Sequence, residues 1–337
     1  LSISRRIYTL ERFTDTGGGL DQCCLNPQWE ATAELLDSEQ IASMAERERY
    51  GLWRRLEQTI CRHRQFSDAA WAMRPEQLDR LSVISGKLTP PSPQIRCLSL
   101  FDPDDSTNHD APGDWRAHAA GLAIQRQDAI RELLAIGNET LLTFVSEVAS
   151  PYLVGSSWDE FNDRCDDGVL LPHFLIAGSE AMQHAARGYV QGRFSTGGWQ
   201  WLDSLSWADW HPAEVARLFT YLPFTPDAWT RMEAGGQSVS KQYWPAIKVW
   251  LNVEPEHTVE CALKLLENDR PFAALRLLHR ATRNKKQVPT DVLTRAFRDA
   301  IQKETSVSDI ALYELGELIQ QLQGRTDADP GALCQIE

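Results

Sequence analysis

Apolar residues recur at intervals of three or four along most of this chain, and this spacing constrains the fold more than any other feature. An α-helix of 3.6 residues per turn brings such positions onto one face, where they can be buried together. Runs that alternate apolar and polar residues, as half-buried strands do, are almost absent, and no β–α–β rhythm appears. The sequence therefore predicts an all-α fold.

The helical pattern is most regular between residues 258 and 323. Four short helices are expected there: one over 258–266, a partner opened by Pro271, a third opened by Pro289 and a fourth capped within 306–309. Proline suits a first helical turn because its missing N–H would have no partner there. Short helices need neighbours to bury their apolar faces, so we predict an irregular α-solenoid of antiparallel helix pairs.

Three helices with defined ends are predicted further upstream. One long helix is expected over 41–63, with Gly51 as a kink. A second opens at Pro75, in a first-turn position. A third is expected over 115–136, where Gly137 would stop it in a left-handed conformation.

The whole chain divides into four predicted parts. They are an irregular N-terminal segment at 1–36, a helical array at 37–253 with an acidic loop at 101–114, regular helix pairs at 254–325, and a C-terminal tail at 326–337.

The charge balance bears on the choice of partner. The formal net charge is −13 and the isoelectric point is about 5.1. Nucleic-acid binding draws much of its affinity from neutralised phosphates, so an acidic chain disfavours nucleic acid, and it disfavours an anionic membrane surface for the same reason. A protein partner is the favoured expectation.

The cysteines and the apolar runs indicate the compartment. The seven cysteines are odd in number and none is spaced as C-x-x-C, so we expect free thiols in the reducing cytoplasm. No apolar run approaches the length of a membrane helix, so no membrane span is expected. Because the first residue is Leu1, we also expect the chain to be a segment of a longer protein.

No motif points to a reaction. The sequence has no phosphate-binding glycine loop, no H-E-x-x-H pair and no G-x-S-x-G elbow. The acidic run 163–168 fails the spacing of a calcium loop. We therefore expect no metal, no cofactor and no catalytic residue, although 47 carboxylates leave an acid–base pair open. A non-catalytic role is favoured over an enzyme.

Tryptophan is unusually abundant, with 12 residues in the chain. Tryptophan anchors protein interfaces and stacks on sugars or bases, so the cluster between residues 199 and 210 is a candidate partner-binding site. The alternative is that these rings pack between helices. The four candidates are Trp199, Trp201, Trp207 and Trp210.

Positive charge gathers near the C-terminal end. Between Arg270 and Lys303 the chain has nine basic residues and two acidic ones. This basic patch could recruit an acidic partner or nucleic acid, or could match the acidic loop within the chain. Its candidate binding residues are Arg280, Arg283, Lys285 and Lys286.

Two segments carry a family resemblance. Residues 267–278 (ENDRPFAALRLL) place small residues at a helix crossing with leucines around them, and residues 187–201 repeat this in degenerate form. Both resemble tetratricopeptide-type repeats, and the chain is similar to helical-repeat regions of large bacterial multidomain proteins. The resemblance implies an interaction or scaffold module that senses or binds a protein partner. The alternatives are a nucleic-acid-binding module that uses the basic patch, and an α/α-toroid enzyme that acts on carbohydrates.

Overall fold

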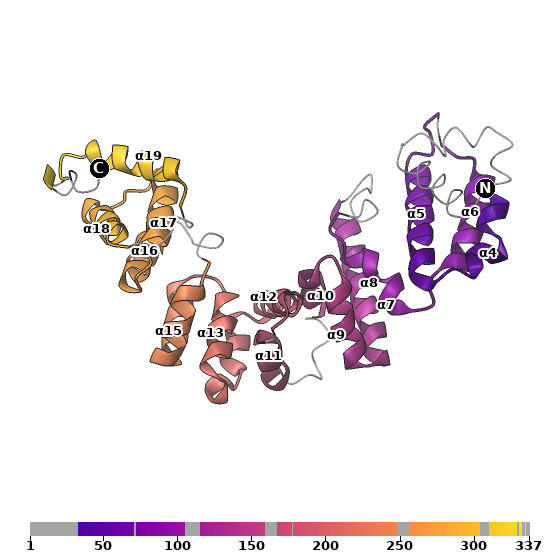
Figure 1. Ribbon diagram of the computed structural model, residues 1–337, viewed down its shortest axis with the longest axis horizontal. Helices are drawn as coiled ribbons and strands as arrows, with labels where there is room; N and C mark the ends of the chain where they lie inside the picture. The colour runs from indigo at the N-terminus through magenta and orange to yellow at the C-terminus, as the bar shows by residue number, and fades with distance from the viewer. Residues whose placement is uncertain are drawn as a thin grey trace. The chain divides into compact units, whose positions relative to one another are not determined.

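A computed structural model describes most of the chain beyond residue 32. Within these residues the fold is all-α and contains no β-strand, which confirms the predicted fold class (Figure 1). The stacking of helix pairs into a solenoid stays a prediction. Nothing in the described part is a helix both long and apolar enough to cross a membrane. The described residues are 33–70, 72–104, 115–158, 167–176, 178–248, 257–303, 310–328, 330, 331 and 334.

Three expected features lie outside these ranges. They are almost all of the N-terminal segment 1–36, residues 105–114 of the acidic loop, and most of the acidic run 163–168. The described part of the chain forms two compact units. Residues 1–164 and 179–192 belong to the first unit, and residues 165–178 and 193–337 to the second.

The first unit opens with a helix pair, α5 (Glu46–Gln65) and α6 (Pro75–Leu88), which lie side by side (Figure 1). The single helix predicted over 41–63 is wrong, because a short α4 (Glu39–Ala42) precedes a break at residues 43–45. Ile41 of α4 is buried in the same cluster as Leu56 of α5, so the apolar spacing is satisfied by two helices. The expected kink site, Gly51, lies inside α5.

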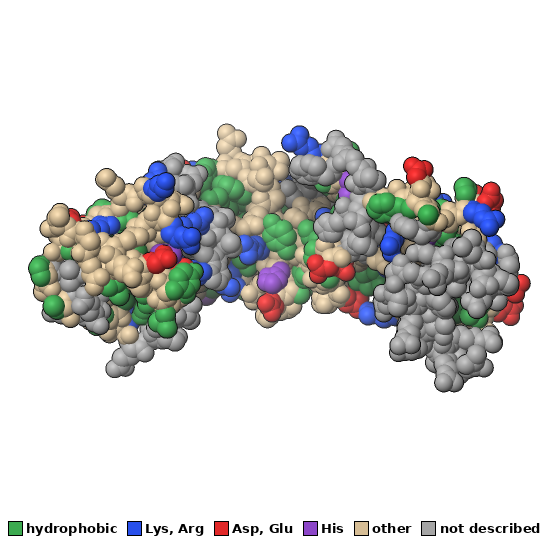
Figure 2. All heavy atoms as spheres, turned by 90° about the horizontal axis from the view of Figure 1, so that it is seen from above, with side chains coloured by type: hydrophobic (Ala, Val, Ile, Leu, Met, Phe, Trp, Pro, Cys, Tyr) green, Lys and Arg blue, Asp and Glu red, His purple; other side chains and the backbone are tan. Residues whose placement is uncertain are grey.

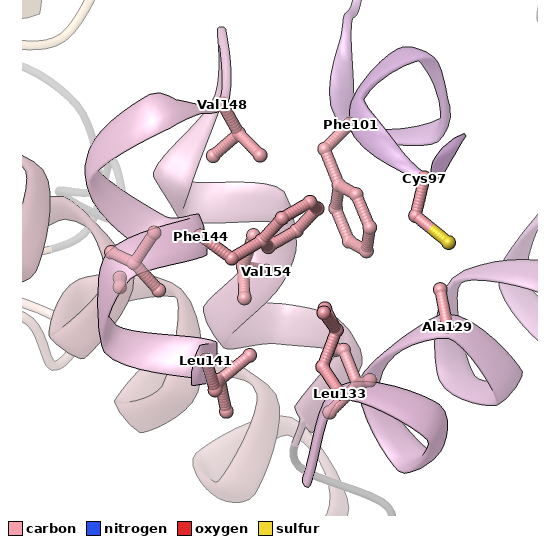
Figure 3. Close-up of a cluster of buried hydrophobic side chains, with 11 residues drawn as sticks. Cys97, Phe101, Ala129, Leu133, Leu141, Phe144, Val148 and Val154 are labelled. Carbon is pink, nitrogen blue, oxygen red and sulfur yellow. The ribbon is translucent and has the colours of Figure 1, made fainter. Parts of the chain in front are cut away.

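A second apolar cluster holds the rest of this unit together (Figure 3). At its centre the ring of Phe101 meets the ring of Phe144 edge-on, with 5.4 Å between centroids. Gly137 ends one helix as predicted, but its φ of 154° and ψ of 156° lie outside the left-handed helical region, and a new helix follows at once. The elements around this cluster are α7 (Pro93–Arg96), η1 (Leu98–Phe101), α8 (Trp115–Ile136), α9 (Asn138–Glu147) and α10 (Pro151–Trp158).

Two glycines let the backbones of α10 and α12 (Glu180–Ser204) touch. A Cβ atom added at Gly155 would lie 1.9 Å from the carbonyl oxygen of Ala185, and one at Gly188 would lie 2.1 Å from that of Tyr152. Only glycine fits such a crossing. Farther along, α12 is broken at Gly198, which has non-helical angles (φ 53°, ψ −147°).

The second unit begins with short helices around an aromatic core. Phe224, Trp229 and Trp244 meet mostly edge-on, a favoured arrangement of aromatic rings, and the two tryptophans are buried. Gly235 and Gly236 separate two of these helices, α14 and α15. The elements are α11 (Asp167–Leu175), the end of α12, η4 (Trp207–Asp209), α13 (Pro212–Thr220), α14 (Pro226–Ala234) and α15 (Gln237–Ala246).

The four helices predicted between residues 258 and 323 are all present: α16 (Thr258–Glu267), α17 (Pro271–Arg283), α18 (Thr290–Ile301) and α19 (Leu312–Gln323). Helix α17 packs against the other three. The cap expected within 306–309 lies outside the described residues. Helix α19 instead begins after Ala311, whose N–H donates to the carboxylate of Glu314 (2.9 Å).

Helices α16 and α17 end alike, each with a non-glycine residue in the left-handed region. Asp269 and Lys285 both have a φ of 58°. After α17 the N–H of Lys286 then donates to the carbonyl of Ala281 (3.0 Å), a bond that closes a Schellman motif. Glycine is the residue that usually occupies this position, so both helix ends carry local strain.

Candidate functional site

A pocket of about 640 Å³ lies over one face of α17, and we call it the α17 pocket. Its size is within the range of pockets that take small ligands or a few side chains of a partner. In the space-filling view, a few Lys and Arg side chains lie among hydrophobic and other atoms on the C-terminal helices (Figure 2). The lining residues are Lys248, Arg270, Ala273, Arg276, Leu277, His279, Arg280, Arg283, Asn284 and Glu314.

The helical period of α17 builds this pocket. Ala273 and Leu277, four residues apart, are buried and supply an apolar floor. Arg276, Arg280 and Arg283 follow the same three-and-four spacing; Arg276 is half-buried, and the other two are exposed. At 1.5 Å of rise per residue, these three arginines span about 10 Å along the helix.

Positive charge exceeds negative charge in the lining. Five of the ten lining residues are Lys or Arg, and Glu314 is the single acid among them in the described part of the chain. Arg270 joins the start of α17 to the end of α15, because its guanidinium donates hydrogen bonds to the carbonyls of Trp244 (2.9 Å) and Ile247 (2.6 Å). The other cations of the described lining are Lys248, Arg276, Arg280 and Arg283, in a chain of net charge −13.

The acidic side of the pocket is organised by His279, which is 3% exposed. Its Nε2 lies 2.7 Å from a carboxylate oxygen of Glu317, and its Nδ1 lies 3.5 Å from one of Glu314. The hydrogen bond with His279, together with nearby Arg283, holds the pKa of Glu317 below its usual range. These contacts tie α19 to α17 and engage the carboxylate of Glu314.

The four residues of the predicted basic patch have different places. Arg280 and Arg283 line the α17 pocket. Lys285 and Lys286 are exposed just beyond the end of α17 and are not among the lining residues.

Three basic residues of the lining, Arg276, Arg270 and Lys248, are not among the candidates that the sequence indicates. Arg276 could have been found, because it precedes Arg280 by four residues and shares its helix face. Arg270 and Lys248 carry no such local signal. Lys248 reaches the pocket only because the end of α15 lies beside α17.

Two of the predicted tryptophans belong to charged side-chain clusters. The Nε1 of buried Trp201 donates to Asp167 (2.7 Å), and Arg193 donates to the same carboxylate oxygen (2.8 and 3.2 Å). Trp199 is half-buried, with Arg231 lying 4.5 Å from its ring centroid, a cation–π distance.

The other two tryptophans are also half-buried. Trp207 meets Phe219 edge-on at 6.0 Å between centroids. The backbone N–H of Trp210 donates to the carbonyl of Trp207 (3.1 Å). The contacts described for the four tryptophans lie within the chain, and their role in binding a partner stays a prediction.

Two of the four described thiols are buried, and the other two, Cys61 and Cys334, are exposed. Burial raises the pKa of the Cys97 thiol to about 11 and that of the Cys261 thiol to about 12, so neither is a thiolate at neutral pH. Within the described ranges, no three His, Cys, Asp or Glu side chains gather as a metal-binding group. No family model, curated protein or solved structure matches the chain.

Proposed function

We propose that the chain is a non-catalytic helical-repeat interaction module of a larger protein, and that the α17 pocket binds a negatively charged segment of a protein partner. The observation that supports this most is the composition of the pocket, in which Lys and Arg surround an apolar floor and outnumber the single described acid. Arginine is enriched at protein interfaces, because its guanidinium can donate two hydrogen bonds to one carboxylate.

The negative charge of the whole chain does not prevent such binding. At physiological ionic strength charges are screened over about 8 Å, so a ligand at the pocket responds mainly to the cations beside it. The acidic residues elsewhere in the chain would instead repel a long polyanion that extends far beyond the pocket.

A second candidate function is nucleic-acid binding. Lys285 and Lys286 continue the positive charge past the end of α17, so a short single strand could contact both the pocket and these two lysines. Nucleic-acid binding would fall steeply with added salt, in proportion to the number of phosphates contacted.

Fluorescence anisotropy with a labelled oligoglutamate peptide and a labelled oligothymidylate tests the two functions on the full chain. We expect oligoglutamate to bind, and we expect an Arg276→Gln/Arg280→Gln variant to bind about tenfold more weakly or worse. The control Arg295→Gln/Arg298→Gln changes the net charge equally on exposed positions of α18, outside the pocket, and should bind as the wild type does.

Each other result has a definite meaning. Binding of oligothymidylate alone, with a steep salt dependence, would favour the nucleic-acid function. Equal binding of oligoglutamate by both double variants, or no binding of either probe, would reject the α17 pocket as the site.

A further inference from the structure

His279 has a buried imidazole whose two ring nitrogens both face carboxylates of α19. Its Nε2 lies 2.7 Å from an oxygen of Glu317, and its Nδ1 lies 3.5 Å from an oxygen of Glu314. A neutral imidazole has one N–H donor and one acceptor nitrogen, so it can donate to one carboxylate while its acceptor nitrogen faces the oxygens of the other. The imidazolium has two donors and is attracted to both glutamates at once.

The titratable and charged groups around this ring come from several helices. Helix α19 supplies Glu314, Glu317 and Tyr313, whose ring lies edge-on to the imidazole with 6.4 Å between centroids. Among the buried residues of α16 is the Cys261 thiol, which stays uncharged because its pKa is raised to about 12. The buried residues of α18 are apolar. The cations that line the same pocket are Lys248, Arg270, Arg276, Arg280 and Arg283. The two carboxylates, which favour a charged ring, are the charged groups that contact it.

The first half of α19 depends on these polar contacts. The buried residues of the helix, Leu318 and Leu322, lie in its second half. In the first turn, Leu312 is 78% exposed and Tyr313 is 62% exposed, so they contribute little buried apolar surface. Contacts of this kind open locally at a lower free-energy cost than a packed apolar face does.

We propose that His279 is a pH-sensitive clamp, which holds the first half of α19 against α17 as the imidazolium and releases it as the neutral imidazole. Imidazole changes charge between about pH 5 and 8. The hydrogen bond with His279 lowers the pKa of Glu317, so this carboxylate stays ionised throughout that range. The contribution of the clamp is therefore present at mildly acidic pH and is lost as the pH rises.

The clamp also regulates the α17 pocket, a step that rests on the proposed function. Glu314 is the single acid in the described lining, and the imidazolium compensates its charge. Once the ring has lost its proton, this carboxylate repels an acidic segment in the pocket. Binding of such a segment should therefore weaken as the pH rises.

Hydrogen exchange of the full chain, corrected for the intrinsic effect of pH on amide exchange, tests the clamp. We compare the amides of residues 315–318 at about pH 5.5 and about pH 8.5, on either side of the range in which imidazole titrates. A charged hydrogen bond is stronger than a neutral one, so we expect protection to fall about tenfold at the higher pH. The amides of residues 320–323, beside buried Leu322, are the internal reference and should change much less.

Two variants and one control assign the effect to His279. His279→Gln keeps one donor without a titratable charge, so the protection of residues 315–318 should no longer depend on pH. Glu317→Gln, at an exposed position, tests the same contact if the first variant does not fold, and should reduce the pH dependence to less than about threefold. The control is His184→Gln, an exposed histidine of α12 that lies 3.8 Å from Glu180, and it should behave as the wild type does. Protection independent of pH in the wild type, or a pH dependence that survives the change at Glu317, would overturn the proposal.

Oligoglutamate titrations at the same two pH values separate this inference from the proposed function. We expect binding to be about threefold weaker at the higher pH. If protection depends on pH but oligoglutamate does not bind at either pH, the clamp stands and the proposed function is overturned. If oligoglutamate binds and protection is independent of pH, the clamp is overturned and the proposed function stands. Equal binding at both pH values with pH-dependent protection would overturn the regulation of the pocket alone.

Discussion

Two groups of arginines in the second unit have opposite surroundings. Arg193 and Arg231 each contact an indole ring and hydrogen-bond to an aspartate, Asp167 in the first case and Asp203 in the second. The arginines of the α17 pocket share a lining with one described carboxylate. Arg193 and Arg231 therefore join parts of the second unit to one another, whereas the arginines on α17 line a pocket.

The balanced group is built for stability. Asp167 is 8% exposed and accepts hydrogen bonds from both Arg193 and Trp201. Removal of one partner from a buried ion pair leaves the other charge without compensation, which costs more than the pair itself contributes.

The largest expected effect is that of Asp167→Ala. This change leaves the guanidinium of Arg193 and the indole N–H of Trp201 without their shared acceptor, so we expect the free energy of unfolding to fall by about 3 kcal/mol. Urea unfolding followed by tryptophan fluorescence measures it. The control Asp209→Ala, at an exposed position, should change stability by less than about 0.5 kcal/mol. Equal effects of the two variants would contradict the structural role of Asp167.

Replacing Arg193 or Arg280 by alanine should distinguish an arginine that stabilises the fold from one that binds an anion. Arg193→Ala leaves Asp167 buried without its cation, and we expect a loss of about 2 kcal/mol. Arg280 is exposed at the pocket, so Arg280→Ala should alter stability by no more than about 0.5 kcal/mol while weakening anion binding. Chemical denaturation and anion titration of both variants test this. A large loss of stability with Arg280→Ala would show that the pocket arginines are structural as well.

Arg231→Ala should have an intermediate effect. The pair with Asp203 has two hydrogen bonds (2.8 and 3.1 Å) and stacks on Trp199, but solvent screens it, so we expect a loss of about 1 kcal/mol. The hydrogen bond from Arg231 lowers the pKa of Asp203, so the contribution is present at neutral pH and is lost as the pH falls through that lowered pKa. Unfolding of wild type and variant at neutral and strongly acidic pH should show the difference shrinking with acid; a difference independent of pH would contradict this account.

The smallest effect is expected at the end of α17. Lys285→Gly relieves a left-handed backbone without touching the pocket lining, so we expect a gain of about 0.5 kcal/mol and unchanged binding of oligoglutamate. Thermal unfolding and oligoglutamate titration measure the two quantities. Weaker binding of oligoglutamate by this variant would extend the site beyond the α17 pocket.

The sequence predicts the local part of this fold well. The four C-terminal helices follow from apolar spacing and from prolines in first turns, because each of these signals acts within a single helix. The break between α4 and α5 was missed because residues on both sides of it contribute to one apolar cluster, which leaves the periodicity intact.

Features that join distant segments were not predictable from spacing. The hydrogen bond from Arg193 to Asp167 joins residues that are 26 positions apart in the sequence. The close contact of Gly155 with α12 depends on the packing of α10 against α12. Arg280 and Arg283 were identified from the local density of charge, whereas Lys248 and Glu314 enter the pocket from other elements. The sequence therefore predicts some of the residues that α17 contributes to the pocket, but not those contributed by other elements.

We propose that anions bind at the α17 pocket, where five of the ten lining residues are Lys or Arg. The most direct measurement is an oligoglutamate titration of the ¹⁵N-labelled chain that follows the arginine Nε–H resonances by NMR. The account predicts saturable shifts for Arg276 and Arg280, with Arg193 and Arg231 nearly unchanged. Shifts that are equal across all four arginines, or confined to Arg193 and Arg231, would contradict it.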